Sequence, residues 1–250
     1  MTAPQTVVIT GAAQGIGKAY ALAMAETGAN VVLLDVNHER VNAAADELIA
    51  RGLSVSAEAV DVSDEADCES LANRLSERVE TVHGLVHNAA IFSTIEMKPF
   101  WEIAVAEWDA LMAVNLRGPW LLTKALLPLL RATKSASIVN ISSDSLWMGR
   151  SGYLHYVASK AGVYGMTHSM AHELGEFGIR VNSLSPGPVF TEIDRGTVTE
   201  AQKEGMRNAQ ALKRLAVPDD MVGVLKFLLS EDSRWMTGQT FHVNGGLLHR

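Results

Sequence analysis

Two ionisable residues, Tyr156 and Lys160, lie four positions apart in the segment Tyr156-Val-Ala-Ser-Lys160. The surrounding apolar residues recur at helical spacing, so we expect both side chains on one face of a helix. A tyrosine hydroxyl has an ordinary pKa of about 10, and a neighbouring ammonium lowers that pKa because it favours the phenolate. Tyr156 is therefore a candidate general acid or base at neutral pH. Tyr153 is a weaker candidate, because Val157 and not a lysine follows it by four residues.

A serine upstream, Ser143, is placed to share the same chemistry. It follows the run 137–142, whose apolar and β-branched residues predict a buried parallel strand. A hydroxyl at the carboxyl end of such a strand faces the crevice in which open α/β sheets bind ligands. Ser143 would there donate a hydrogen bond to the oxygen that Tyr156 protonates. Serine is also an ordinary turn residue and the Tyr-x-x-x-Lys spacing is common, so these residues do not decide the function alone.

The N-terminal segment has the order strand, glycine turn, helix. Thr6-Val-Val-Ile-Thr10 predicts a buried strand, and an apolar helical periodicity follows the turn. Glycines allow a tight turn and the close approach of a pyrophosphate, whose charge the helix N-terminus meets. The spacing Gly-x-x-x-Gly-x-Gly differs from the common dinucleotide fingerprint, but its context is the one that a dinucleotide site requires. The glycines expected to approach the cofactor here are Gly11, Gly15 and Gly17.

A carboxylate at the end of the second predicted strand indicates which dinucleotide is bound. The strand 30–34 ends at Asp35, close to the distance after the glycine turn at which a ribose-binding acid is expected. A carboxylate there accepts hydrogen bonds from the ribose hydroxyls and repels a 2′-phosphate. Asp35 therefore predicts NAD rather than NADP, with a solvated acid at a strand end as the alternative interpretation.

Polar residues after the third and fourth predicted strands extend this site. Asp61, followed by Val62, is placed to reach the adenine edge, although an acid there also suits the cap of the next helix. Asn88 and Ala89 follow the fourth strand, where small residues let the backbone pass close to a cofactor. Asn88 is equally suited to bracing neighbouring backbone groups.

The second half of the chain contributes a predicted kink, a tight turn and a cover. Asn115 interrupts a long helix predicted over 105–131, which indicates either a kink that frees a carbonyl for a bound water or a simple bend. Pro186 and Gly187 form a turn after the sixth strand, and the hydroxyl of Thr191 is suited to a phosphate or an amide. The polar, weakly periodic segment 192–212 predicts a mobile lid.

Length and composition limit the number of domains, the classes of binding partner and the cellular location. A chain of 250 residues with 48% hydrophobic content allows one large α/β domain or two small ones, and no linker marks a boundary. We expect one domain over 1–250, with a dinucleotide-binding half near 1–135 and a catalytic and substrate half near 136–250. The net charge of −7 argues against nucleic acid and anionic membrane as partners. Cys68 is the only cysteine and no signal peptide is recognisable, so we expect a reducing, cytoplasmic location. We expect no metal site.

These motifs, in this order, make the chain resemble the short-chain dehydrogenase/reductase family from Thr6 to Gly246. The resemblance implies one Rossmann-type doubly wound α/β domain, a seven-stranded parallel sheet in the order 3-2-1-4-5-6-7, and a homotetramer. The chain departs from the family pattern at His87 and Ala90, where asparagine and glycine are usual. The matching motifs are Thr10-Gly11-Ala-Ala-Gln-Gly15-Ile-Gly17, Asp61-Val62, Asn88-Ala89-Ala90, Asn115-Leu-Arg-Gly118, Ser143, Tyr156-Val-Ala-Ser-Lys160, Pro186-Gly187 with Thr191, and Asn244-Gly-Gly246.

The resemblance also implies roles for individual residues. Tyr156 is then the general acid/base, Lys160 holds the nicotinamide ribose and Ser143 stabilises the substrate oxygen. Asn115 fixes a water that relays protons, and Thr191 contacts the carboxamide. The full set implied for cofactor binding is Gly11, Gln14, Gly15, Ile16, Gly17, Asp35, Asp61, Val62, Asn88, Ala89, Tyr156, Lys160, Pro186, Gly187, Val189 and Thr191.

Within this family the chain is similar to the 1-phenylethanol dehydrogenase-like secondary alcohol dehydrogenases, through Asp35, the segment 100–108 and the C-terminus. We therefore expect an NAD(H)-dependent oxidoreductase that interconverts a secondary alcohol and a ketone. A 3-oxoacyl-carrier-protein reductase is the alternative of the same class, but such enzymes typically use NADPH, which Asp35 disfavours. A non-catalytic nucleotide-sensing module is the alternative of another class, and we would expect it to have lost Tyr156 or Lys160.

Loops after the fourth, fifth and sixth strands are expected to form the substrate pocket. They are mostly apolar and contain no arginine or lysine, although Arg150 lies just outside them. Such a pocket binds by burial and penalises an unpaired charge, so we expect an apolar, aromatic or cyclic substrate. Some of these residues also suit a core or a subunit interface. The residues expected to contact substrate are Ile91, Ser143, Ser145, Trp147, Met148 and Phe190.

Overall fold

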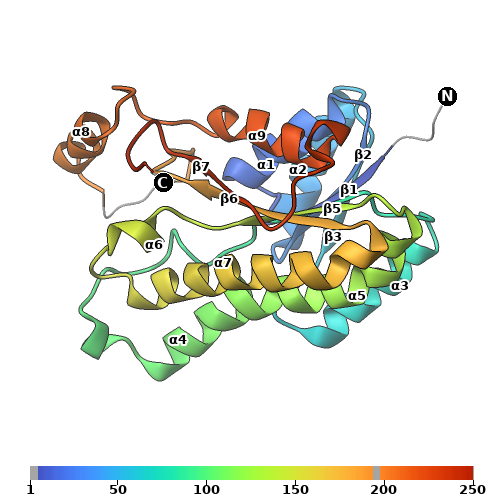
Figure 1. Ribbon diagram of the computed structural model, residues 1–250, viewed down its shortest axis with the longest axis horizontal. Helices are drawn as coiled ribbons and strands as arrows, with labels where there is room; N and C mark the ends of the chain where they lie inside the picture. Colours follow the sequence, from blue (N-terminus) through green and yellow to red (C-terminus); the bar gives the residue numbers. More distant parts are fainter. Residues whose placement is uncertain (1–4, 194–197, 250) are drawn as a thin grey trace.

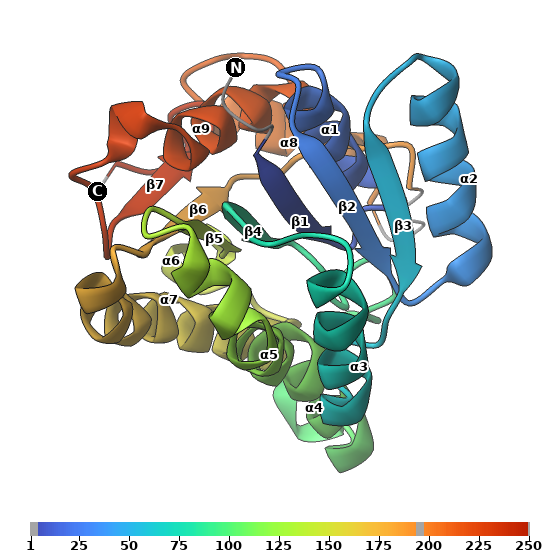
Figure 2. The same cartoon turned by 90° about the vertical axis from the view of Figure 1, so that its right-hand side faces the viewer.

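The computed structural model describes residues 5–193 and 198–249. Its centre is a parallel sheet of seven strands in the order β3-β2-β1-β4-β5-β6-β7 (Figure 2), which confirms the predicted fold class and strand order. The chain changes direction across the sheet between β1 and β4, the place at which open α/β sheets bind ligands. The strands are β1 (Thr6–Thr10), β2 (Asn30–Asp35), β3 (Val55–Ala59), β4 (Gly84–His87), β5 (Ser137–Ile141), β6 (Arg180–Pro186) and β7 (Thr240–Val243).

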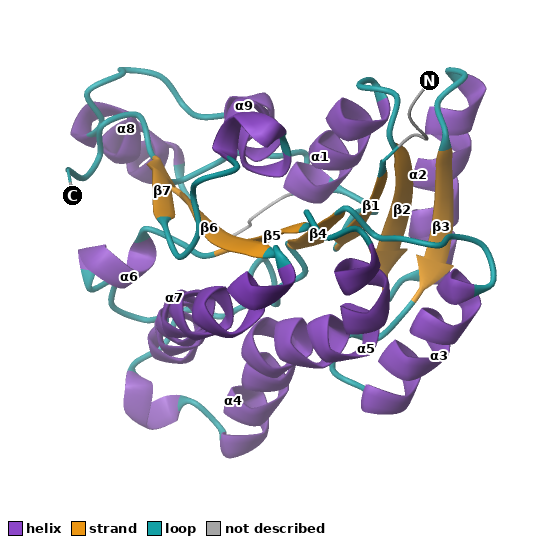
Figure 3. Cartoon of the chain, turned by 45° about the vertical axis from the view of Figure 1, so that its right-hand side comes forward, coloured by secondary structure: helices purple, strands orange, loops and turns teal. Residues whose placement is uncertain are grey.

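Helices cover both faces of the sheet (Figures 1 and 3). One face packs α1, α2 and α9 against Val7 and Ile9 of β1, and the opposite face packs α3, α5 and α7 against Val8. Successive strand residues therefore enter opposite cores, as the pleat requires. The helices are α1 (Gly15–Ala25), α2 (His38–Ala50), α3 (Glu65–Ser76), α4 (Val105–Met112), α5 (Gly118–Ala132), α6 (Ser145–Met148), α7 (Leu154–Leu174), α8 (Glu200–Ala209) and α9 (Asp219–Leu229).

The interruption predicted near Asn115 is a π-helical turn, Ala113–Arg117, which joins α4 to α5. Gly118 follows this turn because the helix passes close to the chain after β3. A Cβ atom on Gly118 would lie 2.9 Å from a methyl group of Val62, so a larger residue would push the two segments apart. The kink prediction is therefore confirmed, with a widened turn as its physical form.

The segment 192–212 differs from the prediction, because Glu200–Ala209 form α8. Thr199 caps this helix, and its side chain and that of Gln202 form a reciprocal capping box. Few apolar side chains mark α8, so the periodicity of the sequence missed it. Part of the predicted lid, residues 194–197, lies outside the described residues, and the motion of the segment stays a prediction.

Two titratable residues away from the predicted site, Cys68 and His87, are buried and contact other groups of the core. Burial raises the pKa of the Cys68 thiol to about 12, and its Sγ lies 3.6 Å from the carbonyl of Val62. Burial lowers the pKa of His87 to about 3, and its Nε2 lies 2.8 Å from the hydroxyl of Thr123. In the described ranges, no group of three or more metal-binding side chains is placed to hold an ion.

Several large apolar side chains stay exposed in and around α4, α5 and the start of α7. They are Phe100, Trp101, Val105, Trp120 and Leu154. An apolar surface of this kind suits an interface between subunits, and the expected homotetramer stays a prediction. No helix that can be described in the chain is long and apolar enough to cross a membrane.

The core holds one polar atom whose removal is expected to stabilise the fold. Tyr20 of α1 is fully buried, and no described group accepts or donates a hydrogen bond to its hydroxyl. A buried, unpaired hydroxyl costs roughly 1–3 kcal/mol, so Tyr20→Phe is expected to raise the free energy of unfolding by about 1 kcal/mol. Thermal denaturation should show a melting temperature raised by roughly 2–4 °C. A lowered melting temperature would contradict the unpaired state of this hydroxyl.

Candidate active site

A cavity of about 900 Å³ opens at the carboxyl ends of the strands. The glycine turn before α1 lies at one part of its wall, and the ends of β2 to β6, the first turns of α7 and one face of α8 form the rest. Figures 1 and 3 show α6 and α8 at this same end of the molecule. The volume lies within the range of about 300–1,000 Å³ that is typical of ligand pockets.

Tyr156 and Lys160 lie one turn apart on α7, in the wall of this cavity. The Lys160 Nζ lies 5.8 Å from the centroid of the Tyr156 ring and donates a hydrogen bond of 2.7 Å to the carbonyl of Ile141. Burial lowers the pKa of Lys160 to about 8. The ammonium is still mostly protonated at neutral pH, so the positive charge that favours a phenolate lies beside Tyr156.

The tyrosine ring is also held by two neighbouring aromatic rings. Phe92, in the loop after β4, has its ring centroid 4.6 Å from that of Tyr156, and the ring of Tyr153 lies 6.5 Å away. Such ring contacts restrict the orientation of the phenol and keep water from its face. The sequence placed Phe92 in a pocket loop without assigning it a contact, and it treated Tyr153 only as a weaker acid/base.

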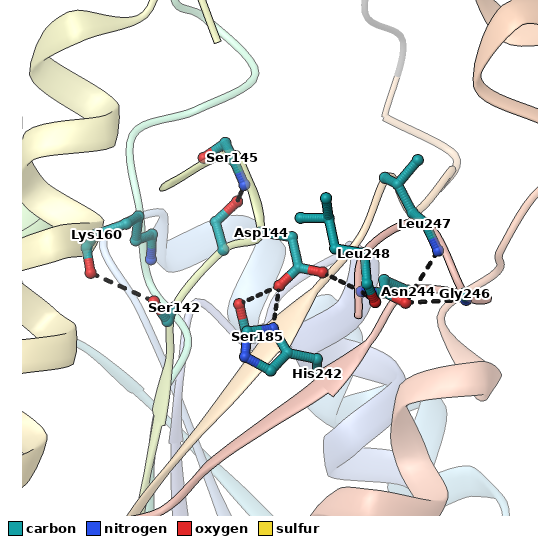
Figure 4. A network of polar contacts seen from close by, with 11 residues as sticks. Ser142, Asp144, Ser145, Lys160, Ser185, His242, Asn244, Gly246, Leu247 and Leu248 are labelled. Atoms are coloured by element: carbon teal, nitrogen blue, oxygen red, sulfur yellow. Dashed lines mark hydrogen bonds and ion pairs between the residues drawn. The ribbon is translucent and has the colours of Figure 1, made fainter. Parts of the chain in front are cut away.

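Ser143 follows β5 and lies in the same wall, and its neighbour Asp144 fixes the local chain (Figure 4). The buried carboxylate of Asp144 accepts hydrogen bonds from the Ser185 hydroxyl (2.7 Å) and the Asn244 amide (2.5 Å). The Nδ1 of His242 lies 2.6 Å from the same carboxylate. One side chain therefore ties the loop after β5 to β6 and to β7, and the sequence analysis did not identify it.

The hydroxyl of Ser143 has one local partner. Its Oγ accepts a hydrogen bond of 3.2 Å from the backbone N–H of Ser145. An oxygen that already accepts a hydrogen bond has its own proton free to donate into the cavity. The Ser145 Oγ is buried in the cavity wall, without a hydrogen-bond partner among the described groups, and it is a second polar group available to a substrate.

Asn115 lies behind the cavity wall rather than in it. Its amide oxygen accepts a hydrogen bond of 2.7 Å from the N–H of Ile91, and its amide nitrogen donates to the carbonyl of Ile91 and to the hydroxyl of Ser159. Ser159 donates in turn to the carbonyl of Tyr156. Asn115 thus joins the π-helical turn to the loop after β4 and to α7, and its role toward a water stays a prediction.

The glycine turn has the shape and polarity of a pyrophosphate site. A Cβ atom on Gly17 would lie 2.1 Å from the carbonyl of Gly11, so only glycine permits this fold of the turn. The backbone N–H of Gly15, at the N-terminus of α1, donates a hydrogen bond of 2.7 Å to the carboxylate of Glu192. An anion therefore already sits where the helix N-terminus would meet a phosphate, which shows that these residues fit an anionic cofactor.

Asp35 and Asp61 lie in the cavity wall at the ends of β2 and β3. The carboxylate of Asp35 accepts hydrogen bonds from the N–H groups of Ala13 (3.3 Å) and Asn37 (3.0 Å), so it is held beside the glycine turn. The carboxylate of Asp61 accepts from Ser63. The cap of α3 is Asp64 rather than Asp61, which removes the capping alternative considered for Asp61.

Asn88 braces the backbone and also lines the cavity. Its amide nitrogen donates to the carbonyls of Thr10 and Gly11 at 3.1 Å each. Thr191 lines the cavity opposite the glycine turn, and its hydroxyl accepts a hydrogen bond from the N–H of Ile193. The predicted residues found in the wall are Gly11, Gln14, Gly15, Ile16, Asp35, Asp61, Val62, Asn88, Ala89, Ile91, Ser143, Ser145, Met148, Tyr156, Lys160, Pro186, Gly187, Val189 and Thr191.

Four predicted residues do not line the cavity: Gly17, Asn115, Trp147 and Phe190. Gly17 is buried beneath the turn that it shapes. The Trp147 ring packs edge-on against that of Tyr164, with the centroids 5.4 Å apart, and its contact with substrate stays a prediction. The N–H of Phe190 pairs with the carbonyl of Ala216, and its side chain is likewise absent from the wall.

The structure adds wall residues to those that the sequence analysis expected to contact a ligand. Arg150, which the sequence places just outside the pocket loops, lies in the wall as a second cation beside Lys160. It lies outside the loops that immediately follow the strands, so its approach depends on the path of the chain between α6 and α7. On α8, Gln202, Gly205, Met206 and Ala209 face the cavity.

The contact between Glu192 and Gly15 predicts a measurable competition with the cofactor. Glu192→Gln replaces the carboxylate with a neutral amide, which binds the positive end of α1 more weakly. A helix-terminus charge interaction is worth about 0.3–1 kcal/mol, so we expect the Kd for NADH to fall roughly twofold to fivefold. Fluorescence titration measures this, with Glu200→Gln on the exposed side of α8 as control. Weaker NADH binding in Glu192→Gln would mean that this side chain helps to hold the cofactor.

The family match and the curated relatives of the chain all point to one family. The family described as Enoyl-(Acyl carrier protein) reductase matches residues 11–248. The chain is 36% identical to the (2S)-[(R)-hydroxy(phenyl)methyl]succinyl-CoA dehydrogenase subunit BbsD of Thauera aromatica, over 97% of this chain and 96% of that protein. It is 34% identical to a 3-oxoacyl-[acyl-carrier-protein] reductase of a Synechocystis species, over 98% of this chain and 97% of that protein.

Solved structures agree with these relatives. A short-chain dehydrogenase/reductase of the glucose/ribitol dehydrogenase type from Brucella melitensis superposes with a TM-score of 0.90 at 32% identity, covering 98% of this chain and 97% of that one. A protein assigned as an NAD(P)-dependent gluconate 5-dehydrogenase from Beutenbergia cavernae, solved with NADP, superposes with a TM-score of 0.91 at 32% identity and the same coverage. The cavity, its glycine turn and these matches show that the chain is an oxidoreductase of the short-chain dehydrogenase/reductase family.

Proposed function

We propose that this protein is an NAD(H)-dependent oxidoreductase that interconverts a secondary alcohol and a ketone. The observation that carries the proposal is that Ser143, Tyr156 and Lys160 line the same cavity as the glycine turn. A cofactor held at that turn and a substrate oxygen near Tyr156 would therefore share one enclosed space. When it is bound there, the nicotinamide supplies hydride transfer.

The chain supplies the handling of the proton. In oxidation, Tyr156 as phenolate accepts the hydroxyl proton of the substrate, and in reduction its phenol returns that proton to the ketone oxygen. The Lys160 ammonium stabilises the phenolate electrostatically, and its bond to Ile141 fixes where that charge lies. The Ser143 hydroxyl donates a hydrogen bond to the substrate oxygen and so holds it against Tyr156.

The preference for NAD rests on Asp35. Its carboxylate is anchored by two backbone N–H groups beside the glycine turn, so it cannot withdraw cheaply from a 2′-phosphate. At the glycine turn, the guanidinium of Arg40 donates a hydrogen bond of 3.2 Å to the side-chain oxygen of Gln14. The ribose hydroxyls of NAD can donate hydrogen bonds to the carboxylate of Asp35, whereas the negative charge of a 2′-phosphate is repelled by it.

An apolar body is proposed for the substrate. The cavity near Tyr156 is lined by Ile91, Phe92, Met148, Tyr153 and Met206, whose burial against a ligand contributes about 0.8 kcal/mol per methylene group. Aromatic or cyclic groups suit these walls best, because flat rings pack well against Phe92 and Tyr153. The Thauera relative, whose name includes a hydroxy(phenyl)methyl group, is consistent with this choice.

The second candidate function is a 3-oxoacyl-carrier-protein reductase. The Synechocystis relative favours it, whereas the matching family description names an enoyl reductase, which acts on a different bond. Asp35 opposes the NADPH that 3-oxoacyl reductases typically use. A nucleotide sensor without catalysis is the candidate of another class. The presence of both Tyr156 and Lys160 in one cavity opposes that candidate.

Removing one oxygen atom tests the proton transfer. Tyr156→Phe is expected to lower kcat by about 10²–10⁴-fold, the usual contribution of a general acid or base, while NADH binding stays close to that of the wild type. The matched control is Tyr153→Phe, which removes a phenol from the same cavity wall but not the one beside Lys160. Retention of more than about a tenth of the wild-type rate in Tyr156→Phe would assign the proton transfer to another residue.

Cofactor choice is the second test. We expect kcat/KM with NAD to exceed that with NADP by at least about tenfold, which corresponds to about 1.4 kcal/mol. Asp35→Ala should narrow this ratio, because it removes the charge that repels the 2′-phosphate. Asp46→Ala, an exposed acid on α2, controls for the change in net charge. Equal use of both cofactors by the wild type, or an unchanged ratio in Asp35→Ala, would refute the NAD assignment.

A further inference from the structure

Among the described residues, the cavity wall contains two lysine or arginine side chains, and only one of them has a role in the proposed proton transfer. Lys160 is buried beside Tyr156 and bonded to Ile141. Arg150 lies in the connection between α6 and α7, with its guanidinium carbon 4.7 Å from the centroid of the Tyr153 ring. Over residues 5–193 and 198–249, no carboxylate lies within ion-pair distance of Arg150.

Most other arginines of the described chain have polar partners, and Arg131 is an exception that lies over the ring of Phe177. Five of them pair with carboxylates: Arg51, Arg74, Arg78, Arg207 and Arg214. The contact with the Tyr153 ring is made by the guanidinium carbon at 4.7 Å and uses none of the N–H groups as donors to an oxygen, so these stay available to an acceptor. A planar fork of that kind matches the two oxygens of a carboxylate.

The position of Arg150 assigns it to the substrate rather than to the cofactor. Anionic groups of the cofactor belong at the N-terminus of α1, where Glu192 now bonds Gly15, and the ribose acid Asp35 ends β2, on the far side of β1. Arg150 stacks on Tyr153, and the Tyr153 ring lies 6.5 Å from that of Tyr156. It therefore stands beyond the acid/base, where the part of the substrate distant from the carbinol would lie.

We propose that Arg150 binds a carboxylate of the substrate, so that the physiological substrate is a hydroxy acid or keto acid with an apolar body. This proposal rests on the function proposed above and narrows its substrate class. A carboxylate is favoured over a phosphate because Arg150 is the only cation at this end of the described cavity wall, whereas two negative charges call for more than one. The buried ring of Tyr153 lies against the guanidinium and shields one side of such a pair from water, which strengthens it.

The test compares an acid with its ester. The acid is 3-hydroxy-3-phenylpropanoate, and its methyl ester differs only in the missing charge. We expect the wild type to have a kcat/KM for the acid at least tenfold above that for the ester, and Arg150→Gln to lower the acid-to-ester ratio at least tenfold, mainly through KM. Arg131→Gln is the matched control, because Arg131 also stacks on an aromatic ring, that of Phe177, on a distant helix. It should leave the ratio unchanged.

An unchanged ratio in Arg150→Gln, or a wild type that prefers the ester, would overturn the proposal. A phosphorylated analogue, 2-hydroxy-2-phenylethyl phosphate, forms a further arm. If Arg150→Gln impaired only this compound, the carboxylate assignment would be wrong. Calorimetric titration of 3-phenylpropanoate into the NADH-bound enzyme needs no turnover, and Arg150→Gln should weaken that binding at least tenfold.

The same experiment separates the two proposals. If the wild type oxidises neither 1-phenylethanol nor the hydroxy acid with NAD, the proposed function fails, and the titration then decides the role of Arg150 by itself. If 1-phenylethanol is oxidised but 3-phenylpropanoate binds equally to wild type and Arg150→Gln, the function stands and the carboxylate site is refuted.

Discussion

The hydrogen bond from the Lys160 ammonium to the carbonyl of Ile141 is the contact on which the site depends. It joins α7 to the end of β5, and so joins the element that carries Tyr156 to the element that ends beside Ser143. An ammonium is costly to bury, and burial has lowered its pKa to about 8. In return, a positive charge in a low-dielectric environment stabilises a neighbouring phenolate more strongly than the same charge in water.

A second polar anchor sets the other half of the geometry. The carboxylate of Asp144 collects donors from β6 and β7, at residues 41 to 100 positions away along the chain (Figure 4). A buried acid is stable only when such donors surround it. The loop after β5 is therefore part of the sheet's polar interior rather than a free surface turn. The Ser143 hydroxyl owes its position to strands that contribute no catalytic group themselves.

Local patterns in the sequence predicted the strands well because buried parallel strands are apolar throughout. The run Thr6–Thr10 has the predicted bounds, and the Tyr156–Lys160 spacing places both side chains in one wall. Features set by distant contacts escaped prediction. Helix α8 escaped prediction because few of its residues are apolar, and none of them is buried. The approach of Arg150 depends on a connection that turns at Gly149 and Gly152, both with positive φ, and no sequence period encodes that path.

The π-helical turn between α4 and α5 changes the rotational phase of a nearly continuous helix. One additional residue in a turn advances the following side chains by about 100° around the axis. Helix α4 packs against α7, whereas α5 packs against α3 and β4, so the two halves must present apolar residues in different directions. A regular α-helix without this turn would leave the apolar face of either α4 or α5 exposed to water. The widened turn therefore lets α4 and α5 pack against different neighbours although they form a nearly continuous helix. Deletion of a single residue in this turn would rotate the apolar side chains of one of the two helices away from their packing partners.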